Sequence, residues 1–244
     1  MTTPRTPSTQ PRTPGGAGSG SRAAVLARVR AALRDVPATE RPEDVPVSRD
    51  YRRSHLDDDP ARRLAVLHEN LVDYRASVHP ATPGAVAATV ARLLAERGSA
   101  SCVVPPGLPE EWLAELGDGV EVLRDDPAGR PLGAERLDAV DAVLTGCAVA
   151  VAETGTIVLD ASAGQGRRVL TLIPDHHVCV VRADQVVASV PQALAVLDPT
   201  RPLTWISGPS ATSDIELDRV EGVHGPRRLD VILVHADGDA PPAP

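Results

Sequence analysis

The sequence predicts a three-layer α/β fold, in which a twisted mixed sheet carries helices on both faces and is preceded by a helical N-terminal extension. Three observations support this prediction. Apolar residues recur at helical spacing through the first hundred residues, short β-branched runs follow them, and 42% of the 244 residues are hydrophobic. A chain of this length and composition can bury a sizeable core.

Three helices are predicted in the first part of the chain. Ser21 is placed to cap the first helix, Asp59-Pro60 opens the second, and Thr82-Pro83 opens a third that ends at Gly98. Each helix has an apolar face, made in turn by Val25, Leu26, Val29, Leu33 and Val36; by Leu64, Leu67, Leu71, Val72 and Val78; and by Val86, Val90, Leu93 and Leu94.

Short runs rich in β-branched residues, each bounded by Gly, Pro or Asp, predict the strands. Val231–Val234 is apolar at every position, which is typical of a parallel strand covered on both faces. Four predicted strands fall between Val149 and Val181 with little room for helices, so hairpins are expected there. The predicted strands are Ser101–Val104, Val120–Leu123, Ala142–Leu144, Val149–Ala152, Thr156–Leu159, Val169–Ile173, Val178–Val181, Thr204–Ser207 and Val231–Val234, and helical pieces are expected at Glu110–Leu116, Ala134–Val140 and Pro191–Leu197.

Composition sets the predicted domain boundaries. Residues 1–20 are rich in Thr, Pro, Gly and Ser and predict a disordered tail, and residues 237–244 predict a loose C-terminal tail. Residues 21–98 are expected to form a helical segment that packs on the same domain as the sheet. Residues 99–236 are expected to form the α/β core.

Charge and composition exclude several functions. All 25 basic residues are Arg, so neither a Schiff-base lysine nor a Walker-type phosphate-binding lysine is present. The net charge of −8 disfavours binding to nucleic acid or to an anionic membrane surface, and an aromatic content of 2% disfavours base stacking. A small molecule or a protein partner is therefore expected. Whether several copies of the chain associate stays open.

The three cysteines, Cys102, Cys147 and Cys179, lie far apart in apolar, strand-like runs. They predict buried thiols rather than a disulfide framework or an iron–sulfur cluster held by this chain. No apolar stretch approaches the length that spans a bilayer, and the first residues lack the apolar centre of a signal peptide. A cytoplasmic protein is therefore expected.

Glu153 follows a run of small and apolar residues at a predicted strand end, and Thr154, Gly155 and Thr156 come directly after it. A carboxylate at the end of a buried strand can act as a base or a nucleophile, so Glu153 is a candidate catalytic residue. The three residues after it are candidate ligand-binding residues. The alternative is an ordinary Thr-Gly turn beside a solvated glutamate.

The second candidate segment is Gly164-Gln165-Gly166-Arg167-Arg168. A Gly-x-Gly turn lets backbone N–H groups approach an anion, and an arginine adds a planar fork for a carboxylate or phosphate. All five residues are candidate ligand-binding residues. The third glycine of a dinucleotide fingerprint is missing, so a Rossmann cofactor loop is not supported. A hairpin loop with surface arginines is the alternative.

Asp175-His176-His177 suggests metal ligation at first sight. Neighbouring side chains on a strand point to opposite faces, and two adjacent histidines without a third spaced ligand are a poor zinc pattern. No metal site is therefore expected. One histidine can face a site while the other packs or is solvated.

A hydroxyl-rich loop follows the predicted strand Thr204–Ser207. Ser213 and Glu216 have the spacing of a capping box, which predicts a helix N-terminus suited to a hydroxylated or singly charged ligand. His224 lies further along as a candidate acid–base group, although a merely exposed loop histidine is the alternative. The candidate ligand-binding residues of this region are Ser207, Gly208, Ser210, Thr212, Ser213, Asp214 and Gly225.

Together these segments resemble a known family. The resemblance is to the lactate-utilisation protein C family, the stand-alone form of the LUD domain, and it is carried by TGC, AETGTIVLD, GQGRR, LTLIPDHHVCVV, SGPSATSDIE and EGVHGP. It covers roughly the last hundred residues densely. The resemblance implies a fold similar to the sugar-phosphate isomerase and CoA-transferase-like group. It also implies a role in oxidising L-lactate to pyruvate, alongside partner proteins that carry the iron–sulfur clusters.

Three functional hypotheses follow. The first is a cytoplasmic component of an L-lactate utilisation system that has no cofactor of its own and binds a small hydroxy- or keto-acid. The second is an independent acyl-, CoA- or phosphate-handling enzyme that uses Glu153, Arg167 or Arg168, and His224, because a strand-end glutamate is the covalent nucleophile of related CoA transferases. The third is a non-catalytic assembly or ligand-sensing subunit.

Overall fold

The computed structural model describes residues 18–37, 39–44, 46–48, 50–212, 220–221 and 224–235. The chain divides after Tyr51 into two units, which we describe separately. The first unit contains α1 (Gly18–Ala32) and the 3-10 turn η1 (Pro42–Asp44). The apolar side chains of its helical segment, such as Val25 and Val29, are exposed. That this segment packs on the core stays a prediction.

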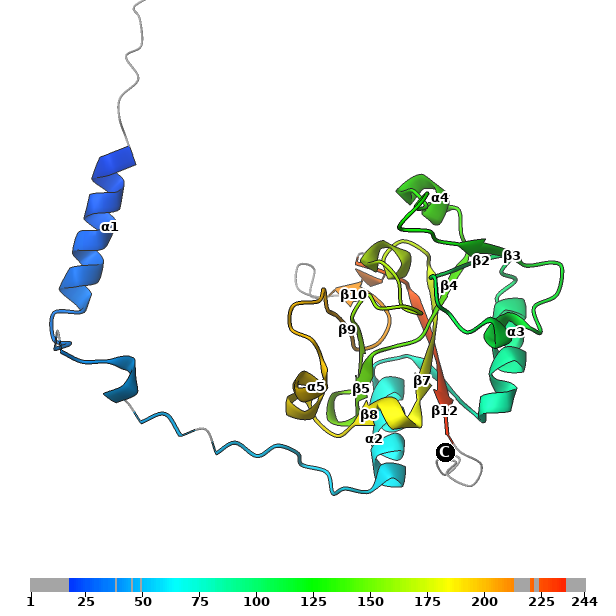
Figure 1. The fold of residues 1–244 in the computed structure, drawn as a ribbon, viewed down its shortest axis with the longest axis horizontal. Coiled ribbons are helices and arrows are strands. Elements are labelled where there is room, and N and C mark those ends of the chain that lie inside the picture. The colour runs from blue at the N-terminus through cyan, green and yellow to red at the C-terminus, as the bar shows by residue number, and fades with distance from the viewer. Residues whose placement is uncertain are drawn as a thin grey trace, which may run out of the picture. The chain divides into compact units, whose positions relative to one another are not determined.

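The second unit is a mixed α/β fold built around a six-stranded parallel sheet (Figure 1), which confirms the predicted fold class. The strand order is β1-β12-β7-β4-β2-β3. The specific likeness to the CoA-transferase group stays a prediction. The six strands are β1 (Ser77–Ala81), β2 (Ser101–Val104), β3 (Glu121–Arg124), β4 (Ala142–Thr145), β7 (His176–Arg182) and β12 (Arg228–Val234).

A second, four-stranded sheet contains the predicted hairpin. Its order is β8-β5-β6-β9, with β5–β6 and β6–β9 antiparallel and β5–β8 parallel. β10 (Ala211–Thr212) and β11 (Val220–Glu221) pair as a separate antiparallel ladder. The strands of the second sheet are β5 (Val149–Val151), β6 (Thr156–Leu159), β8 (Val186–Val187) and β9 (Thr204–Ile206).

Helices α2 (Pro60–Asp73) and α3 (Val86–Glu96) cover opposite faces of the six-stranded sheet (Figure 1). Alternate side chains of β7 pack on the two sides, Cys179 in the cluster that contains α2 and Val180 in the cluster that contains α3. The remaining helical elements are α4 (Ala134–Asp138), α5 (Val190–Val196), η2 (Pro83–Ala85), η3 (Glu110–Leu113), η4 (Ala152–Thr154), η5 (Arg168–Thr171) and η6 (Ala183–Gln185).

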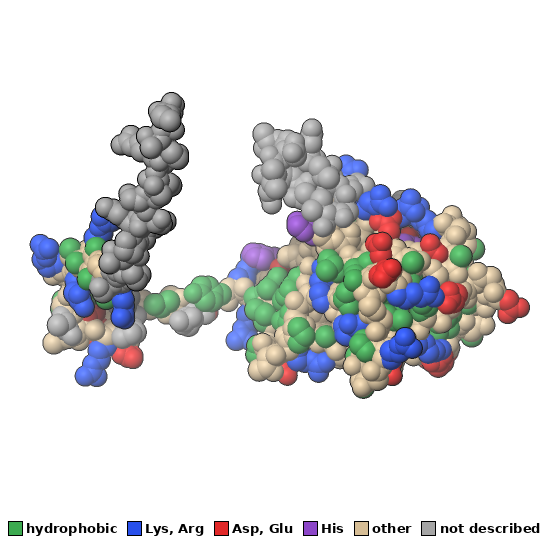
Figure 2. Space-filling view, turned by 90° about the horizontal axis from the view of Figure 1, so that it is seen from above, with side chains coloured by type: hydrophobic (Ala, Val, Ile, Leu, Met, Phe, Trp, Pro, Cys, Tyr) green, Lys and Arg blue, Asp and Glu red, His purple; other side chains and the backbone are tan. Residues whose placement is uncertain are grey.

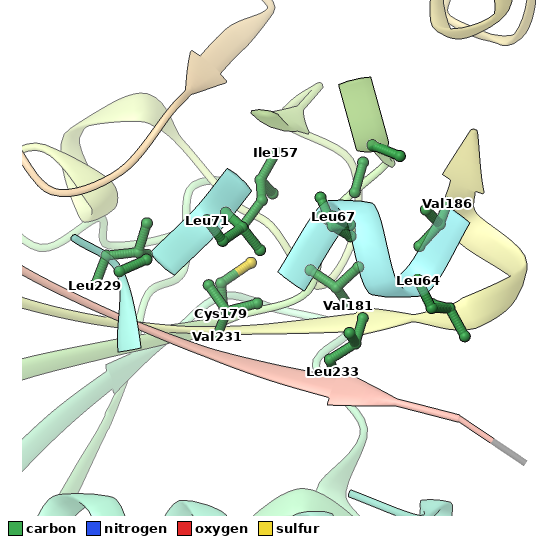
Figure 3. Close-up of a cluster of buried hydrophobic side chains, with 14 of the residues drawn as sticks. Leu64, Leu67, Leu71, Ile157, Cys179, Val181, Val186, Leu229, Val231 and Leu233 are labelled. Atoms are coloured by element: carbon green, nitrogen blue, oxygen red, sulfur yellow. The ribbon is translucent and has the colours of Figure 1, made fainter. Parts of the chain in front are cut away.

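Helix α2 lies between the two sheets (Figure 3). Leu67 and Leu71 are fully buried and pack in one cluster with Val181 of the six-stranded sheet and Ile157 of the four-stranded sheet. The helix begins where Asp59 accepts a hydrogen bond from Ala61 N at 3.0 Å, which confirms the predicted start. The helix therefore joins the two sheets through a shared apolar core.

Two predicted elements are wrong. Val169–Ile173 is not a strand, because residues 168–171 form the 3-10 helix η5 and bury Leu170. Val78 does not continue helix α2, which ends at Asp73, but belongs to strand β1 at the edge of the sheet. Because β1 is an edge strand, it tolerates Pro80, which has no backbone N–H to donate to a neighbouring strand. The predicted helix start at Ser213 lies outside the described residues.

The surface of the second unit carries both signs of charge. On the face shown in Figure 2, Arg side chains are interspersed with Asp and Glu rather than gathered into one large patch. Among the described residues no helix has the length and apolar character needed to cross a membrane.

Candidate functional site

A pocket of about 200 Å³ opens where the loop after β9 meets the segment before β12. We call it the Arg168 pocket. It brings together six of the predicted site residues from three separate segments of the chain. They are Arg168, Ser207, Gly208, Ser210, His224 and Gly225.

Two hydrogen bonds hold the two loops of this pocket together. Ser210 N donates to Pro226 O at 2.8 Å, and His224 N donates to Ser210 Oγ at 3.0 Å. A hydroxyl that accepts a hydrogen bond keeps its own hydrogen available as a donor. Ser210 therefore both fixes the loop and offers a donor to a ligand.

Gly208 allows the loop to pack on the end of helix α2. Its φ angle is +87°, and a Cβ atom at this position would lie 2.3 Å from Tyr74 O. Only glycine fits both the backbone angle and the contact. The position of the Ser207–Ser210 loop therefore depends on this residue.

Arg168 supplies the positive charge of the pocket. Its Nη1 donates to Thr171 Oγ1 at 3.3 Å and its Nη2 to His224 O at 3.4 Å. Within the described ranges no carboxylate forms an ion pair with it. Burial lowers the pKa of Arg168 below its ordinary value, but an arginine remains charged in a protein. A ligand carboxylate can therefore bind to this guanidinium without displacing a protein carboxylate.

His177 lines the same pocket as a neutral side chain. It is 1% exposed, and its Nε2 lies 2.8 Å from Thr145 Oγ1. Burial, followed by the charges of His176 and Arg168, lowers the pKa of His177 to about 3. At neutral pH this imidazole adds no charge to the pocket, so it can contribute only as a polar, uncharged wall.

Thr154 and Thr156 reach the pocket indirectly. Thr156 Oγ1 lies 2.8 Å from both Thr154 Oγ1 and Ser207 Oγ, so three hydroxyls form a hydrogen-bonded chain that ends at the pocket wall. Gly155, at φ +55°, packs against helix α2, where a Cβ atom would lie 2.8 Å from Asn70 Cβ. The predicted Thr-Gly-Thr turn thus supports Ser207 and joins it to α2.

Glu153 does not line the Arg168 pocket. One of its carboxylate oxygens, Oε1, accepts hydrogen bonds from His55 N at 2.5 Å, Leu56 N at 3.2 Å and Ser54 Oγ at 3.2 Å. These contacts fasten the segment before α2 to the turn after β5. A catalytic role for Glu153 stays a prediction. In the structure its carboxylate is hydrogen-bonded to the segment that precedes α2.

The residues of the Gly164–Arg168 segment do not all face one pocket. Arg167 forms a two-point ion pair with buried Asp125, at 2.8 Å through Nε and 2.7 Å through Nη2. Burial alone would raise the pKa of Asp125, but the hydrogen bonds and charge of Arg167 outweigh it and lower that pKa. The fork of Arg167 is therefore occupied, and Arg168 is the arginine that faces the pocket.

Two further pockets are lined by the other residues of this segment. Gly164 and Gln165 line one of about 150 Å³ at the carboxyl ends of β2, β4 and β7. Gly166 and Arg167 line one of about 240 Å³, which shares Arg168, Thr171 and Thr204 with the Arg168 pocket. The Gln165 side chain is hydrogen-bonded within its own loop, to Asp160 N at 2.6 Å and Ser162 Oγ at 2.8 Å.

Sequence reasoning missed or left unassigned nine of the fifteen described residues that line this pocket, among them Thr171, Trp205 and His177. Thr171 lies in the 3-10 helix that was predicted as a strand, and Trp205 lies on edge strand β9. His177 is the member of the histidine pair that faces the pocket. Thr212 belongs to β10, and the candidates Ser213 and Asp214 lie outside the described residues.

Within the described part of the chain, no group of three or more His, Cys, Asp or Glu side chains is placed to hold a metal ion. The three cysteines are buried, and burial raises the pKa of Cys102 and of Cys179 to about 12. Because thiolates are the form that ligates iron–sulfur clusters, these thiols are poorly suited to that role as they stand.

A family model described as "LUD domain" matches residues 64–234. The chain belongs to the LUD domain family. This confirms the predicted resemblance, and the match contains every described residue of the Arg168 pocket.

Members of the family that resemble this chain share one name. A Deinococcus radiodurans protein named Lactate utilization protein C is 50% identical over 182 residues, which are 72% of this chain and 82% of the relative. Relatives of the same name from Geobacillus kaustophilus and Bacillus subtilis are each 31% identical, over 70% and 55% of their own lengths and 63% and 52% of this chain. The crystal structure of a DUF162 family protein from D. radiodurans has a TM-score of 0.61 and 41% identity, and the match covers 73% of this chain and all of that one.

Replacing Glu153 tests whether its carboxylate is structural. Glu153→Ala removes the acceptor for two backbone N–H groups, so we expect the free energy of unfolding to fall by about 1–3 kcal/mol. Urea denaturation measures this change, and Glu115→Ala, on an exposed turn, is the matched control. If Glu153→Ala is as stable as the control while Glu153→Gln loses all turnover, Glu153 is catalytic and the structural account fails.

The Asp125–Arg167 pair predicts a loss of stability in acid. Because the pKa of Asp125 is lower in the folded than in the unfolded chain, its contribution is complete above about pH 4 and is lost as the pH falls further. Asp125→Asn should lower the free energy of unfolding at pH 7 by about 1–3 kcal/mol, and nearer the lower value because Arg167 is partly exposed. In this variant the free energy of unfolding should also decline less steeply below about pH 4. Unfolding curves between pH 7 and pH 3 measure both effects. A decline as steep as that of the wild type and of the exposed-site variant Asp118→Asn would contradict this assignment.

Proposed function

We propose that this chain acts in lactate utilisation and that its Arg168 pocket binds a small 2-hydroxy or 2-oxo monocarboxylate. The name of its relatives supports the pathway, since the relatives described above are all named Lactate utilization protein C. The chemistry of the pocket supports the ligand. The single observation that carries the proposal is the Arg168 guanidinium, which lies beside hydroxyl groups in this pocket and has no acidic partner among the described residues.

The pocket matches the functional groups of such a ligand. The guanidinium of Arg168 offers a planar fork to one carboxylate. The hydroxyls of Thr171, Ser207 and Ser210 are able both to donate to and to accept from a neighbouring hydroxyl or carbonyl oxygen. Since neutral His177 adds no second charge, one negative charge on the ligand balances the charge of Arg168. A cavity of about 200 Å³ admits a ligand of this size.

The redox step of lactate oxidation needs an electron acceptor, which we assign to iron–sulfur partner proteins in the cytoplasm. The buried cysteines, with pKa values about 12 at Cys102 and Cys179, support a chain that holds no cluster itself. In this proposal the chain supplies the binding site for the acid or its product. His224, exposed at the pocket, is the residue closest in kind to a proton-transfer group there.

Arg168→Gln tests the ligand site. Removing the guanidinium should weaken the binding of L-lactate or pyruvate at least about tenfold, because a charge-assisted, two-point contact is lost. Isothermal titration calorimetry measures the dissociation constants. Arg136→Gln, which breaks only a surface ion pair with Glu121, should bind like the wild type.

The same variants connect the pocket to the pathway. In a strain lacking the gene, the wild type and Arg136→Gln should restore growth on L-lactate, and Arg168→Gln should restore it poorly. If Arg168→Gln binds both acids normally, the site assignment is wrong. If deleting the gene leaves growth on L-lactate unchanged, the pathway assignment is wrong.

Partner proteins are tested by purification of the tagged chain from cells grown on lactate. We expect iron–sulfur proteins to copurify and the purified complex to show the visible absorption of iron–sulfur clusters. The same proteins should remain bound to Arg168→Gln, because this substitution lies inside a pocket. Purified chain that carries a stoichiometric cluster without any partner would show that the cluster belongs to this chain instead.

A further inference from the structure

A second pocket, of about 500 Å³, lies at the edge of the six-stranded sheet where the parallel strands β4, β7 and β12 begin. We call it the amino-edge pocket. The proposed function uses none of its residues. The residues that matter here are Arg97, Asp138, Asp141, Asp175, His176 and Arg228.

The buried carboxylate of Asp230 lies between two histidines, one of which, His176, lines this pocket. Asp230 is 1% exposed, with Oδ1 at 2.6 Å from His79 Nε2 and Oδ2 at 2.7 Å from His176 Nε2. Because an ionised carboxylate only accepts hydrogen bonds, both imidazoles donate to it through Nε2. Asp230 thus fixes the orientation of the His176 ring, as a carboxylate does for a histidine in many functional sites.

The other ring nitrogen of His176 has no hydrogen-bond partner among the described residues. His176 is 3% exposed, and its Nδ1 is buried without a hydrogen bond in the part of the chain that the structure describes. A buried polar atom left unpaired destabilises the fold, and such atoms are rare. His176 lines the amino-edge pocket, so a molecule bound there can supply the missing partner.

Three arginines, Arg97, Arg227 and Arg228, line the same pocket. Arg97 lies at the C-terminal end of α3, with Nη2 at 3.8 Å from Asp230 Oδ2. Arg228 is in register with His176 on the neighbouring strand, so their side chains share one face of the sheet. The Arg228 side chain is exposed, and within the described ranges no carboxylate forms an ion pair with it.

The carboxylates on the pocket lining are largely committed elsewhere. Asp141 Oδ2 accepts from Ala100 N, Ser101 N and Ser101 Oγ, each at 2.9 Å. Asp175 binds Arg227 at 2.6 Å and 3.0 Å. Asp138, at the exposed end of α4, is the remaining acid. The lining therefore offers arginine donors near His176 more readily than it offers acceptors.

We propose that the amino-edge pocket is a binding site for a phosphate group, held by Arg97, Arg228 and Nδ1 of His176. A phosphate suits this nitrogen in either protonation state. Its P–OH donates to the lone pair of a neutral imidazole, and its P–O⁻ accepts from an imidazolium, whereas a carboxylate at neutral pH can only accept. The remaining oxygens accept from the two guanidinium groups. The volume exceeds that of inorganic phosphate alone, which favours a small phosphate ester.

The test follows the ring nitrogens of His176 by NMR in the full chain labelled with 15N-histidine. Sodium phosphate, glycerol phosphate and sodium acetate are titrated separately at constant ionic strength. Phosphate and glycerol phosphate should shift the His176 signals in a saturable manner, and acetate should not. Tighter binding of glycerol phosphate identifies an ester as the ligand, and equal binding identifies the phosphate group alone.

Surface variants locate the site. Arg228→Gln and Arg97→Gln should each weaken phosphate binding about tenfold, the effect of one charge-assisted contact. Arg92→Gln, on the same helix as Arg97 but paired with Glu96, should leave it unchanged. Arg168→Gln should also leave it unchanged, which separates this site from the Arg168 pocket. The proposal is overturned if the His176 signals do not respond to phosphate, respond equally to acetate, or respond equally in Arg228→Gln.

Discussion

The burial of helix α2 between two sheets is the constraint on which the rest of the structure depends. Leu67 and Leu71 are fully buried and share one apolar cluster with side chains from both sheets. Burying a leucine stabilises a fold by about 1.5–3 kcal/mol, so this layer is a large contribution on the scale of a domain's net stability. With α2 in place, the four-stranded sheet is held over one face of the six-stranded sheet. The Arg168 pocket forms where loops from these two sheets meet.

The end of α2 also sets the detailed shape of the pocket. Two glycines with positive φ angles, Gly155 and Gly208, lie against Asn70 and the Tyr74 backbone, where any larger residue would collide. Between these glycines, Thr156 and Ser207 are joined through their hydroxyls. The loop that carries Ser207 is thus located by backbone contacts with a buried helix. Rigid support of this kind is what a binding site needs to hold its donors in fixed positions.

Local sequence patterns were sufficient for most of the sheet and for the polar residues of the pocket, and insufficient for long-range pairing. Strands such as Ser101–Val104 and Thr156–Leu159 have the predicted bounds, because continuous β-branched runs between turn residues identify buried strands. The run Val169–Ile173 is similarly apolar but overlaps a 3-10 helix that buries Leu170 and Thr171, and periodicity cannot distinguish this from a strand over so few residues. Polar contacts between residues far apart in the sequence could not be predicted from local patterns either. Arg167 forms an ion pair with Asp125, 42 residues away, and Glu153 accepts a hydrogen bond from the backbone N–H of His55, 98 residues away.

The neighbours Arg167 and Arg168 show how one fold gives identical side chains different roles. Arg167 is neutralised by a buried carboxylate and stabilises the loop, and Arg168 faces a pocket whose nearest imidazole, His177, is uncharged at neutral pH. The charge on His177 is suppressed by burial, with Arg168 itself adding to the effect. A second negative charge on a ligand would therefore find no second arginine among the described residues that line this pocket. Desolvating that unmatched charge would cost free energy, so the electrostatics of the pocket favour a singly charged acid over a dicarboxylate or a phosphate. The amino-edge pocket, with two arginines near His176, has the opposite preference.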